Sequence, residues 1–209
     1  RALAEMGRRD EAFIATKISI HGEQDGIEQY RHSVKDLRTP VFDLLQVHNL
    51  KDTRAHLRTM RRLKDEGKIR YVGVTIFVDS ANDELARVIE NEPLDFVQCQ
   101  YSIINRGLER HILPAAREKG VAVMVNVPFA RGAAFLAVRG QPVPPWAAAF
   151  NAFTWGQFFL KFVLANEAVT CVIPGTSKVH HMEDNLKAGF GRLPSTAERQ
   201  RMLKYLVEL

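Results

Sequence analysis

Six short apolar runs, each of strand length, alternate along the chain with longer segments of helical periodicity. The runs are rich in Val, Ile, Leu and aromatic residues and do not strictly alternate polar with apolar positions, which is typical of parallel strands buried on both faces. The pattern predicts strands at 12–18, 43–49, 69–77, 95–102, 121–127 and 169–175. It predicts helices at roughly 25–37, 53–66, 80–90, 107–119, 153–166 and 178–188.

The order of these elements limits the fold class. Gly67 and Gly120 each follow a last helical turn and precede the next strand, as a helix C-terminal glycine does. Strict alternation predicts a parallel sheet with right-handed crossovers, either open and doubly wound or closed into a barrel. The open form carries a G-x-G-x-x-G turn after its first strand, and this sequence has none. We therefore expect an α/β protein of the (β/α)8 TIM-barrel class.

A complete barrel needs eight units and about 250 residues, whereas six units are visible in these 209 residues. A helical stub at 1–6 precedes the first strand, and the chain begins with Arg. We expect the first two strands to lie upstream of residue 1, so that residues 1–209 form a single barrel domain incomplete at its N-terminus. The first and last visible strands would then be open edges, which favour pairing with another chain and hence oligomers.

The connection at 131–152 is long, contains three prolines and interrupts the regular alternation. Long loops at the carboxyl end of a barrel strand are usually functional. We interpret this segment as a flap over a ligand. The alternative is a surface excursion that packs Trp146 against the outside of the barrel.

Composition narrows the function classes. Lys and Arg exceed Asp and Glu by 29 to 24, a net charge of +5, which suits a small anionic ligand as well as nucleic acid. No zinc-finger spacing, arginine-rich arm or ribonucleoprotein motif is present, so nucleic-acid binding is not expected. No run of about 18 uncharged apolar residues predicts a membrane helix. Cys99 and Cys171 lie in apolar runs and are expected to be buried thiols.

Polar side chains end several of the predicted strands. Lys17 closes "FIATK" and His48 closes "LLQVH" on the next strand. Active sites of parallel barrels lie at the carboxyl ends of the strands, and neighbouring strands are about 4.8 Å apart. Each residue alone is more often structural, but the two together indicate a shared pocket.

The segment "VIPGTSKVHHMEDN" (172–185) predicts a strand, a tight turn at Pro174 and Gly175, and a helix. Thr176, Ser177 and Lys178 stand at the helix N-terminus, where free N–H groups and the helix dipole favour an anion such as phosphate. The alternative is an ordinary helix cap by one of the hydroxyls.

These stretches resemble the aldo-keto reductase superfamily, whose members are (β/α)8 barrels that reduce carbonyls with NAD(P)H. The resemblance covers nearly the whole chain in the expected order. It rests on "FIATK", "DLLQVHN", "IRYVGVT", "FVQCQYS", "VPFARG" and "VIPGTSKVHHMEDN".

The resemblance implies a catalytic tetrad of Asp, Tyr, Lys and His. It assigns Lys17 to lowering the pKa of a tyrosine acid and His48 to orienting and polarising the carbonyl. The Asp and Tyr would precede residue 1, and Tyr30, in a predicted helix, is no substitute. We therefore expect residues 1–209 by themselves to be inactive.

The resemblance also implies a site for NADP(H), with NAD(H) as the alternative cofactor. Thr75, Gln98 and Asn126 correspond to positions at the nicotinamide, and Phe129 and Arg131 to a turn at the pyrophosphate. The remaining positions, at the 2′-phosphate, ribose and adenine, are Gly175, Thr176, Ser177, Lys178, His181, Asp184 and Asn185.

Four positions depart from the family pattern. Ile76 stands where Asn is usual, Asn126 where a stacking Tyr is usual, Val127 where Ser is usual, and His181 where many members have Arg. These changes leave the choice between NADPH and NADH open. "VNVPF" is similar to a bacterial subgroup whose members often carry a twin-arginine export signal, so the location is either cytoplasmic or periplasmic.

Three functions follow as hypotheses. The first is reduction of a small-molecule aldehyde or ketone by hydride transfer. The second, motivated by Ile76 and Asn126, is a nucleotide-binding sensor or scaffold with little or no catalysis. The third is a lyase that forms a Schiff base through Lys17 on a phosphorylated sugar.

Overall fold

The computed structural model describes residues 2–209, with Ala4 as backbone only, and Arg1 of the predicted stub lies outside the described residues. Six strands form one sheet in the order β1-β2-β3-β4-β5-β6, so each strand neighbours the next in sequence. The pairs β1/β2, β2/β3 and β5/β6 are parallel. The strands are β1 Ala15–Ile18, β2 Phe42–His48, β3 Ile69–Thr75, β4 Phe96–Gln100, β5 Ala122–Asn126 and β6 Val169–Val172.

The chain divides into two compact units. The first unit comprises Arg1–Ile76 with Pro93–Val97, and the second comprises Phe77–Glu92 with Gln98–Leu209. The division passes through β4. The expectation of a single domain over 1–209 stays a prediction.

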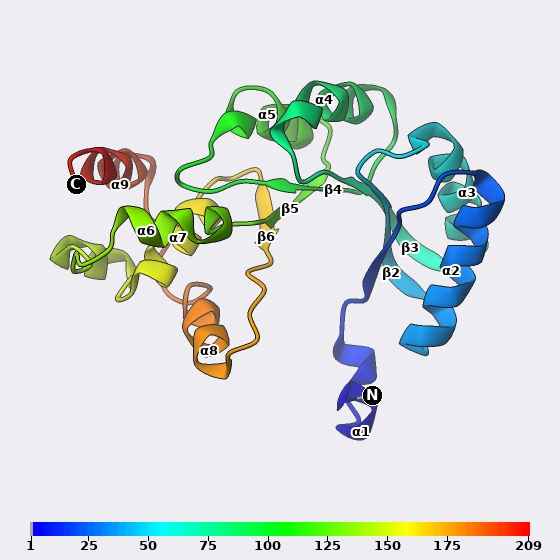
Figure 1. The fold of residues 1–209 in the computed structure, drawn as a ribbon, viewed down its shortest axis with the longest axis horizontal. Helices are drawn as coiled ribbons and strands as arrows, with labels where there is room; N and C mark the ends of the chain where they lie inside the picture. The colour runs from blue at the N-terminus through cyan, green and yellow to red at the C-terminus, as the bar shows by residue number, and fades with distance from the viewer. Residues whose placement is uncertain (1) are drawn as a thin grey trace. The chain divides into compact units, whose positions relative to one another are not determined.

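The first unit holds β1 to β3 and the helices that cover them. Its helices are α1 Ala2–Glu5, η1 Arg9–Glu11, α2 Glu23–Leu37 and α3 Thr53–Asp65. Helices α2 and α3 lie together along β1 to β3 (Figure 1). Tyr30 of α2 packs edge-on against Phe42, with ring centroids 5.7 Å apart. A Cβ at Gly26 would come within 2.6 Å of the His56 ring, so glycine is what allows α2 to approach α3 this closely.

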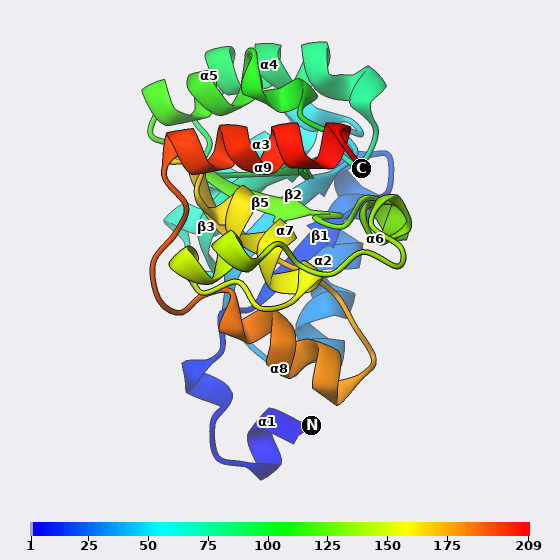
Figure 2. The same cartoon turned by 90° about the vertical axis from the view of Figure 1, so that its left-hand side faces the viewer.

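The second unit is mainly helical. Its elements besides β5 and β6 are η2 Asp79–Ala81, α4 Asn82–Asn91, η3 Gly107–Glu109, α5 Ile112–Glu118, η4 Ala130–Gly132, α6 Ala133–Ala137, η5 Pro145–Phe150, α7 Trp155–Leu164, α8 Val179–Lys187 and α9 Thr196–Val207. Helix α7 lies between α8 and α9 (Figure 2). Every residue from Gly156 to Val163 is buried, which explains why α7 is apolar on all sides.

All six predicted strands are confirmed, with ends that differ by at most three residues from the predicted ones. The glycines after α3 and α5 adopt positive φ, +70° at Gly67 and +67° at Gly120, as predicted. The segment 131–152 is not an irregular loop, since it forms α6 and η5. Trp146 packs against Phe158 and Tyr205, as the alternative interpretation of this segment predicted.

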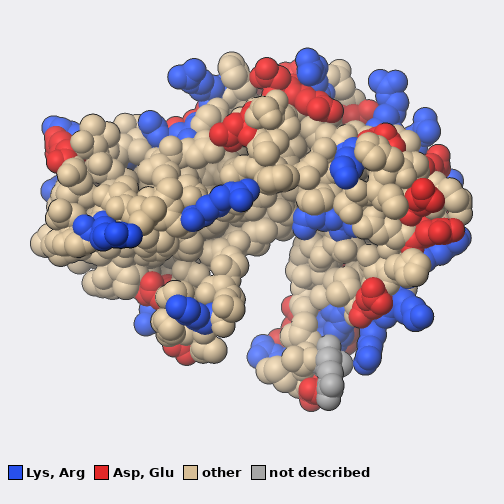
Figure 3. Space-filling view, in the orientation of Figure 1, with Lys and Arg blue, Asp and Glu red and all other residues tan. Residues whose placement is uncertain are grey.

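Charged side chains on the described surface are of mixed sign. Acidic and basic groups are interspersed on the face that Figure 3 shows, consistent with the small net charge of +5. Among residues 2–209, no helix is long and apolar enough to cross a membrane. Within the same residues, no group of three or more His, Cys, Asp and Glu side chains is placed to hold a metal ion.

Candidate active site and nucleotide-binding residues

Lys17 and His48 lie on adjacent strands and on the same face of the sheet. Lys17 of β1 is paired in register with Gln46 of β2, and His48 is paired with Thr75 of β3. Paired residues of parallel strands point to the same side, and residues two apart on a strand do so too. Lys17 therefore lies one step below His48, which confirms the predicted juxtaposition.

The electrostatic environment of this pair disfavours positive charge. The pKa of His48 is lowered by burial first, then by the neighbouring positive charges of Lys17 and Lys51. The pKa of Lys17 is lowered by burial. Since a histidine ordinarily titrates near 6.5, a lowered pKa leaves His48 neutral at pH 7. A neutral imidazole can donate from one ring nitrogen and accept at the other.

The chain leaves β2 in a strained conformation directly after His48. Asn49, Leu50 and Asp52 have φ values of 55°, 54° and 44°, which non-glycine residues rarely adopt. The Asn49 N–H donates to the Thr75 carbonyl (2.7 Å), and Asp52 accepts from the Gly22 N–H (2.8 Å). Such strain clusters at functional sites, and these bonds hold the loop in place.

A second strained turn follows β5 in the other unit. Val127, Ala130 and Arg131 have φ values of 51°, 47° and 56°. The Arg131 guanidinium carbon lies 5.9 Å from the centre of the Phe77 ring. The resemblance places this turn at the cofactor pyrophosphate, and an arginine there suits an anion.

The second unit contains a cavity of about 310 Å³. Three aromatic side chains line it, together with a carboxylate, an amide, a hydroxyl and an imidazole. Six of the predicted cofactor residues meet there. The lining residues are Phe129, Phe135, Thr154, Trp155, Gly156, Gly175, Thr176, His181, Asp184 and Asn185.

Helix α8 begins after the tight turn at Gly175, but neither predicted hydroxyl caps it. Lys178 occupies the N-cap position, and no side chain makes a cap hydrogen bond. Thr176 instead accepts from the Lys178 N–H (3.2 Å). Ser177 is half-buried and Lys178 exposed, so the expectation of an ordinary cap is wrong and the hydroxyl of Ser177 remains available to a ligand.

The remaining predicted residues lie at strand ends. Thr75 is 2% exposed at the end of β3, and Gln98 is 6% exposed within β4. Asn126 is the last residue of β5 and is half-buried. Ile76, where the family pattern has Asn, is 2% exposed, so an apolar side chain fills this position.

Thr154 and Gln157 were not predicted as site residues. Thr154 caps α7 by accepting from the Gln157 N–H, and both side chains donate to Asp184 (2.7 Å each). The signal was present in the sequence, because Thr followed three residues later by Gln before an apolar helix is a capping-box pattern. Trp155 and Phe135 also line the cavity and were not predicted.

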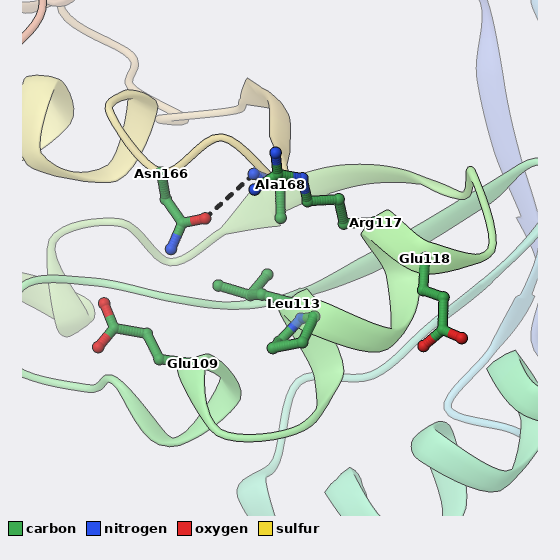
Figure 4. Close-up of a pocket in the computed structure, with 7 residues that line it drawn as sticks. Glu109, Leu113, Arg117, Glu118, Asn166 and Ala168 are labelled. Atoms are coloured by element: carbon green, nitrogen blue, oxygen red, sulfur yellow. Dashed lines mark hydrogen bonds between the residues drawn. The ribbon is translucent and has the colours of Figure 1, made fainter.

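A further hollow of about 470 Å³ lies elsewhere in the second unit (Figure 4). Asn166, at its rim, accepts from the Ala168 N–H (3.1 Å). Glu109 accepts from Arg199 of α9 (2.9 Å) and from the buried Tyr101. The residues around this hollow therefore anchor α9, and those that line it are Glu109, Leu113, Pro114, Arg117, Glu118, Asn166 and Ala168.

The cavity beside α8 fits part of a nicotinamide dinucleotide. Aromatic rings such as Phe129 and Trp155 provide apolar surface for a flat base. Asp184 and Asn185 supply polar groups at one edge, and His181 and Thr176 supply them at another. These are the chemical groups that an adenosine phosphate would require.

Comparison with known proteins agrees with this site. The model of the "Aldo/keto reductase family" matches residues 1–200. "Aldo-keto reductase YhdN" of Bacillus subtilis is 29% identical over 145 residues, 63% of this chain and 43% of that protein. "Uncharacterized oxidoreductase C215.11c" of Schizosaccharomyces pombe is 31% identical over 169 residues, 78% of this chain and 52% of that protein. The chain thus spans about half the length of these relatives.

Two further comparisons cover more of the chain. "Aldo-keto reductase yakc [NADP(+)]" of S. pombe is 27% identical over 233 residues, 90% of this chain and 68% of that protein. The holo form of aldo-keto reductase AKR11C1 from Bacillus halodurans superimposes with a TM-score of 0.76 at 26% identity, covering 97% of this chain and 74% of that one. With a family model that matches residues 1–200, the chain belongs to the aldo/keto reductase family.

Proposed function

We propose that the protein reduces an aldehyde or ketone to an alcohol with a nicotinamide dinucleotide, NADP(H) being favoured over NAD(H). What supports this most directly is the placement of Lys17 and His48 on one face of adjacent strands. Membership of the aldo/keto reductase family supports the same reaction.

Each of the two residues has a role that its environment suits. When bound, the reduced dinucleotide supplies the hydride that adds to the carbonyl carbon. Neutral His48 donates a hydrogen bond to the carbonyl oxygen and so orients and polarises it. The Lys17 ammonium lowers the pKa of the tyrosine to which the family resemblance assigns proton donation.

The preference for NADP(H) rests on the start of α8. Lys178 and His181 place a cation and an imidazole near free helix N–H groups, where a phosphate is favoured. A relative with 27% identity is named for NADP(+). His181 stands where many family members have Arg, so we expect a weaker preference than Arg would give.

The test separates catalysis from binding, with protein made from the complete gene. Lys17→Met should abolish carbonyl reduction and leave NADPH binding, followed by nicotinamide fluorescence, within about threefold of wild type, because Met keeps the bulk of the side chain without its charge. Lys35→Met, which removes an exposed lysine of α2, should retain turnover.

Near-wild-type turnover by Lys17→Met would show that Lys17 has another role. Tight NADPH binding by the wild type without turnover of any carbonyl in a broad panel would favour the sensor or scaffold hypothesis. Trapping of a phosphorylated sugar on Lys17 by borohydride would favour the lyase.

A further inference from the structure

Two side chains at the start of α7 hold the carboxylate of Asp184 in α8. The Thr154 hydroxyl donates to Oδ2 of Asp184 and the Gln157 amide donates to Oδ1, both at 2.7 Å. Each carboxylate oxygen therefore has one donor within the protein. The carboxylate is fixed both in position and in the plane in which it lies.

The two donors are themselves fixed. Thr154 is the N-cap of α7 and accepts from the Gln157 N–H (3.1 Å). Gln157 is 3% exposed, and its Oε1 accepts from the Phe153 N–H (2.9 Å). Since the amide oxygen is already bound, the Gln157 NH₂ group has one orientation. The positive end of the α7 dipole further favours the carboxylate there.

The backbone of α7 is also shaped to this carboxylate. A Cβ on Gly156 would come within 3.0 Å of Oδ2 of Asp184, which is closer than side chains normally pack. Glycine therefore allows α7 to approach Asp184, and the residues on either side of Gly156 contribute to the same clamp. We define the Asp184 clamp as Thr154, Gly156 and Gln157.

The clamp leaves one edge of the carboxylate available to the cavity. Each carboxylate oxygen can accept two hydrogen bonds, and the clamp uses one at each. Asp184 lines the cavity together with Phe129 and Trp155. A flat ring against these aromatic side chains would therefore present its edge to a group that accepts hydrogen bonds and cannot donate them.

We propose that the Asp184 clamp determines base specificity, because Thr154 and Gln157 position Asp184 to select a 6-amino purine over a 6-oxo purine. The inference rests on the proposed binding of a nicotinamide dinucleotide. Adenine carries a donor at position 6, whereas hypoxanthine carries a carbonyl oxygen there. A carbonyl facing a fixed carboxylate gains no hydrogen bond and is repelled, and a buried acceptor without a partner is costly.

The experiment compares NADPH with its deaminated analogue, nicotinamide hypoxanthine dinucleotide phosphate. Nicotinamide fluorescence gives the dissociation constant of each from protein made from the complete gene. Wild type should bind NADPH roughly ten- to a hundredfold more tightly than the analogue, as one hydrogen bond to a charged group predicts. Thr154→Val and Gln157→Leu should each reduce this ratio at least threefold.

Two further variants separate positioning from general damage to the helix. Thr154→Ser keeps the hydroxyl and should restore the wild-type ratio. Lys161→Met alters the same helix at a buried lysine that donates to the Phe190 and Arg192 carbonyls (2.7 and 3.1 Å). It should lower the melting temperature and leave the ratio unchanged, because Lys161 makes no contact with Asp184.

The outcomes distinguish this inference from the proposed function. If wild type binds NADPH but does not discriminate against the analogue, the inference is overturned and the proposed function stands. The same holds if Thr154→Val and Gln157→Leu both keep the wild-type ratio. If Thr154→Val fails to fold, Gln157→Leu and Thr154→Ser still decide. If wild type binds neither dinucleotide, the proposed function is contradicted as well.

Discussion

His48 is surrounded by groups that oppose its protonation. Its side chain is half-buried at the end of β2, and Lys17 and Lys51 add positive charge nearby. Lys51 is held in place, since its Nζ donates to the Ser19 carbonyl (3.0 Å). A histidine in this setting remains neutral at pH values where an exposed one would be half protonated.

The contribution of Lys17 to this effect can be measured. Lys17→Met should raise the pKa of His48 part of the way toward its ordinary value near 6.5, because burial, the larger cause, remains. Lys51→Met should raise it by less, because Lys51 is the smaller of the two Coulombic causes. Titration of the imidazole by NMR reports both changes. A fall in the pKa of His48 in Lys17→Met would contradict the arrangement.

The same shift has a consequence for stability. Because the pKa of His48 is lower in the folded state, the unfolded chain binds more protons in the window just below pH 6.5. The free energy of unfolding therefore increases with pH through that window, as far as His48 contributes. In Lys17→Met this dependence should become shallower.

Helix α9 shows how a single cap couples an element to pH. Ser195 and Glu198 form a capping box, and Glu198 also pairs with Arg192 (2.6 Å). The Arg192 hydrogen bond is the main cause that lowers the pKa of Glu198 to about 2, followed by the Ser195 N–H. A depressed carboxyl pKa stabilises the fold above the ordinary value, and this stabilisation is lost as pH falls toward 2.

Substitution of Glu198 should therefore act on the acid side of the stability profile. Glu198→Gln should reduce the free energy of unfolding at pH 7, with a difference from wild type that shrinks between pH 4.5 and about 2. Glu208→Gln on the same helix, where the pair with Lys204 is exposed and 3.7 Å long, should change little. Urea unfolding at several pH values measures both. Parallel profiles for Glu198→Gln and wild type would contradict the cap.

At the scale of the whole molecule, the predicted functions are divided between the two units. Lys17, His48 and Thr75 belong to the first, and Gln98, the turn after β5 and the cavity beside α8 belong to the second. Binding of a nucleotide to the second unit should therefore be separable from catalysis by the first.

Stabilisation by ligand tests this separation. NADP⁺ at about 100 times its dissociation constant should add about 2.7 kcal/mol to the free energy of unfolding. Adenosine 2′,5′-bisphosphate should also stabilise, because the cavity beside α8 takes the adenosine end. Lys17→Met should show the same increments, measured by thermal unfolding. Loss of stabilisation in that variant would place Lys17 in nucleotide binding.

Much of the architecture was predictable because buried parallel strands leave a strong local signal. The strands carrying Lys17 and His48 were recognised from unbroken apolar runs, and their polar ends followed from where the runs stop. Helix α9 was not predicted, since Met202 is the only one of its residues that is fully buried among those described. A helix so polar on every side has little apolar periodicity to recognise.

The sequence by itself determined the order of strands and helices, the pairing of Lys17 with His48 across adjacent strands, and the family. These depend on local periodicity and on residues a few positions apart, which a single chain reveals. Only the tertiary structure decided that Trp146 packs against Phe158 and Tyr205, and that Asp184 lies in the clamp of Thr154 and Gln157. Those contacts join residues about 30 or more positions apart or the faces of separate helices, and their geometry depends on how the helices pack.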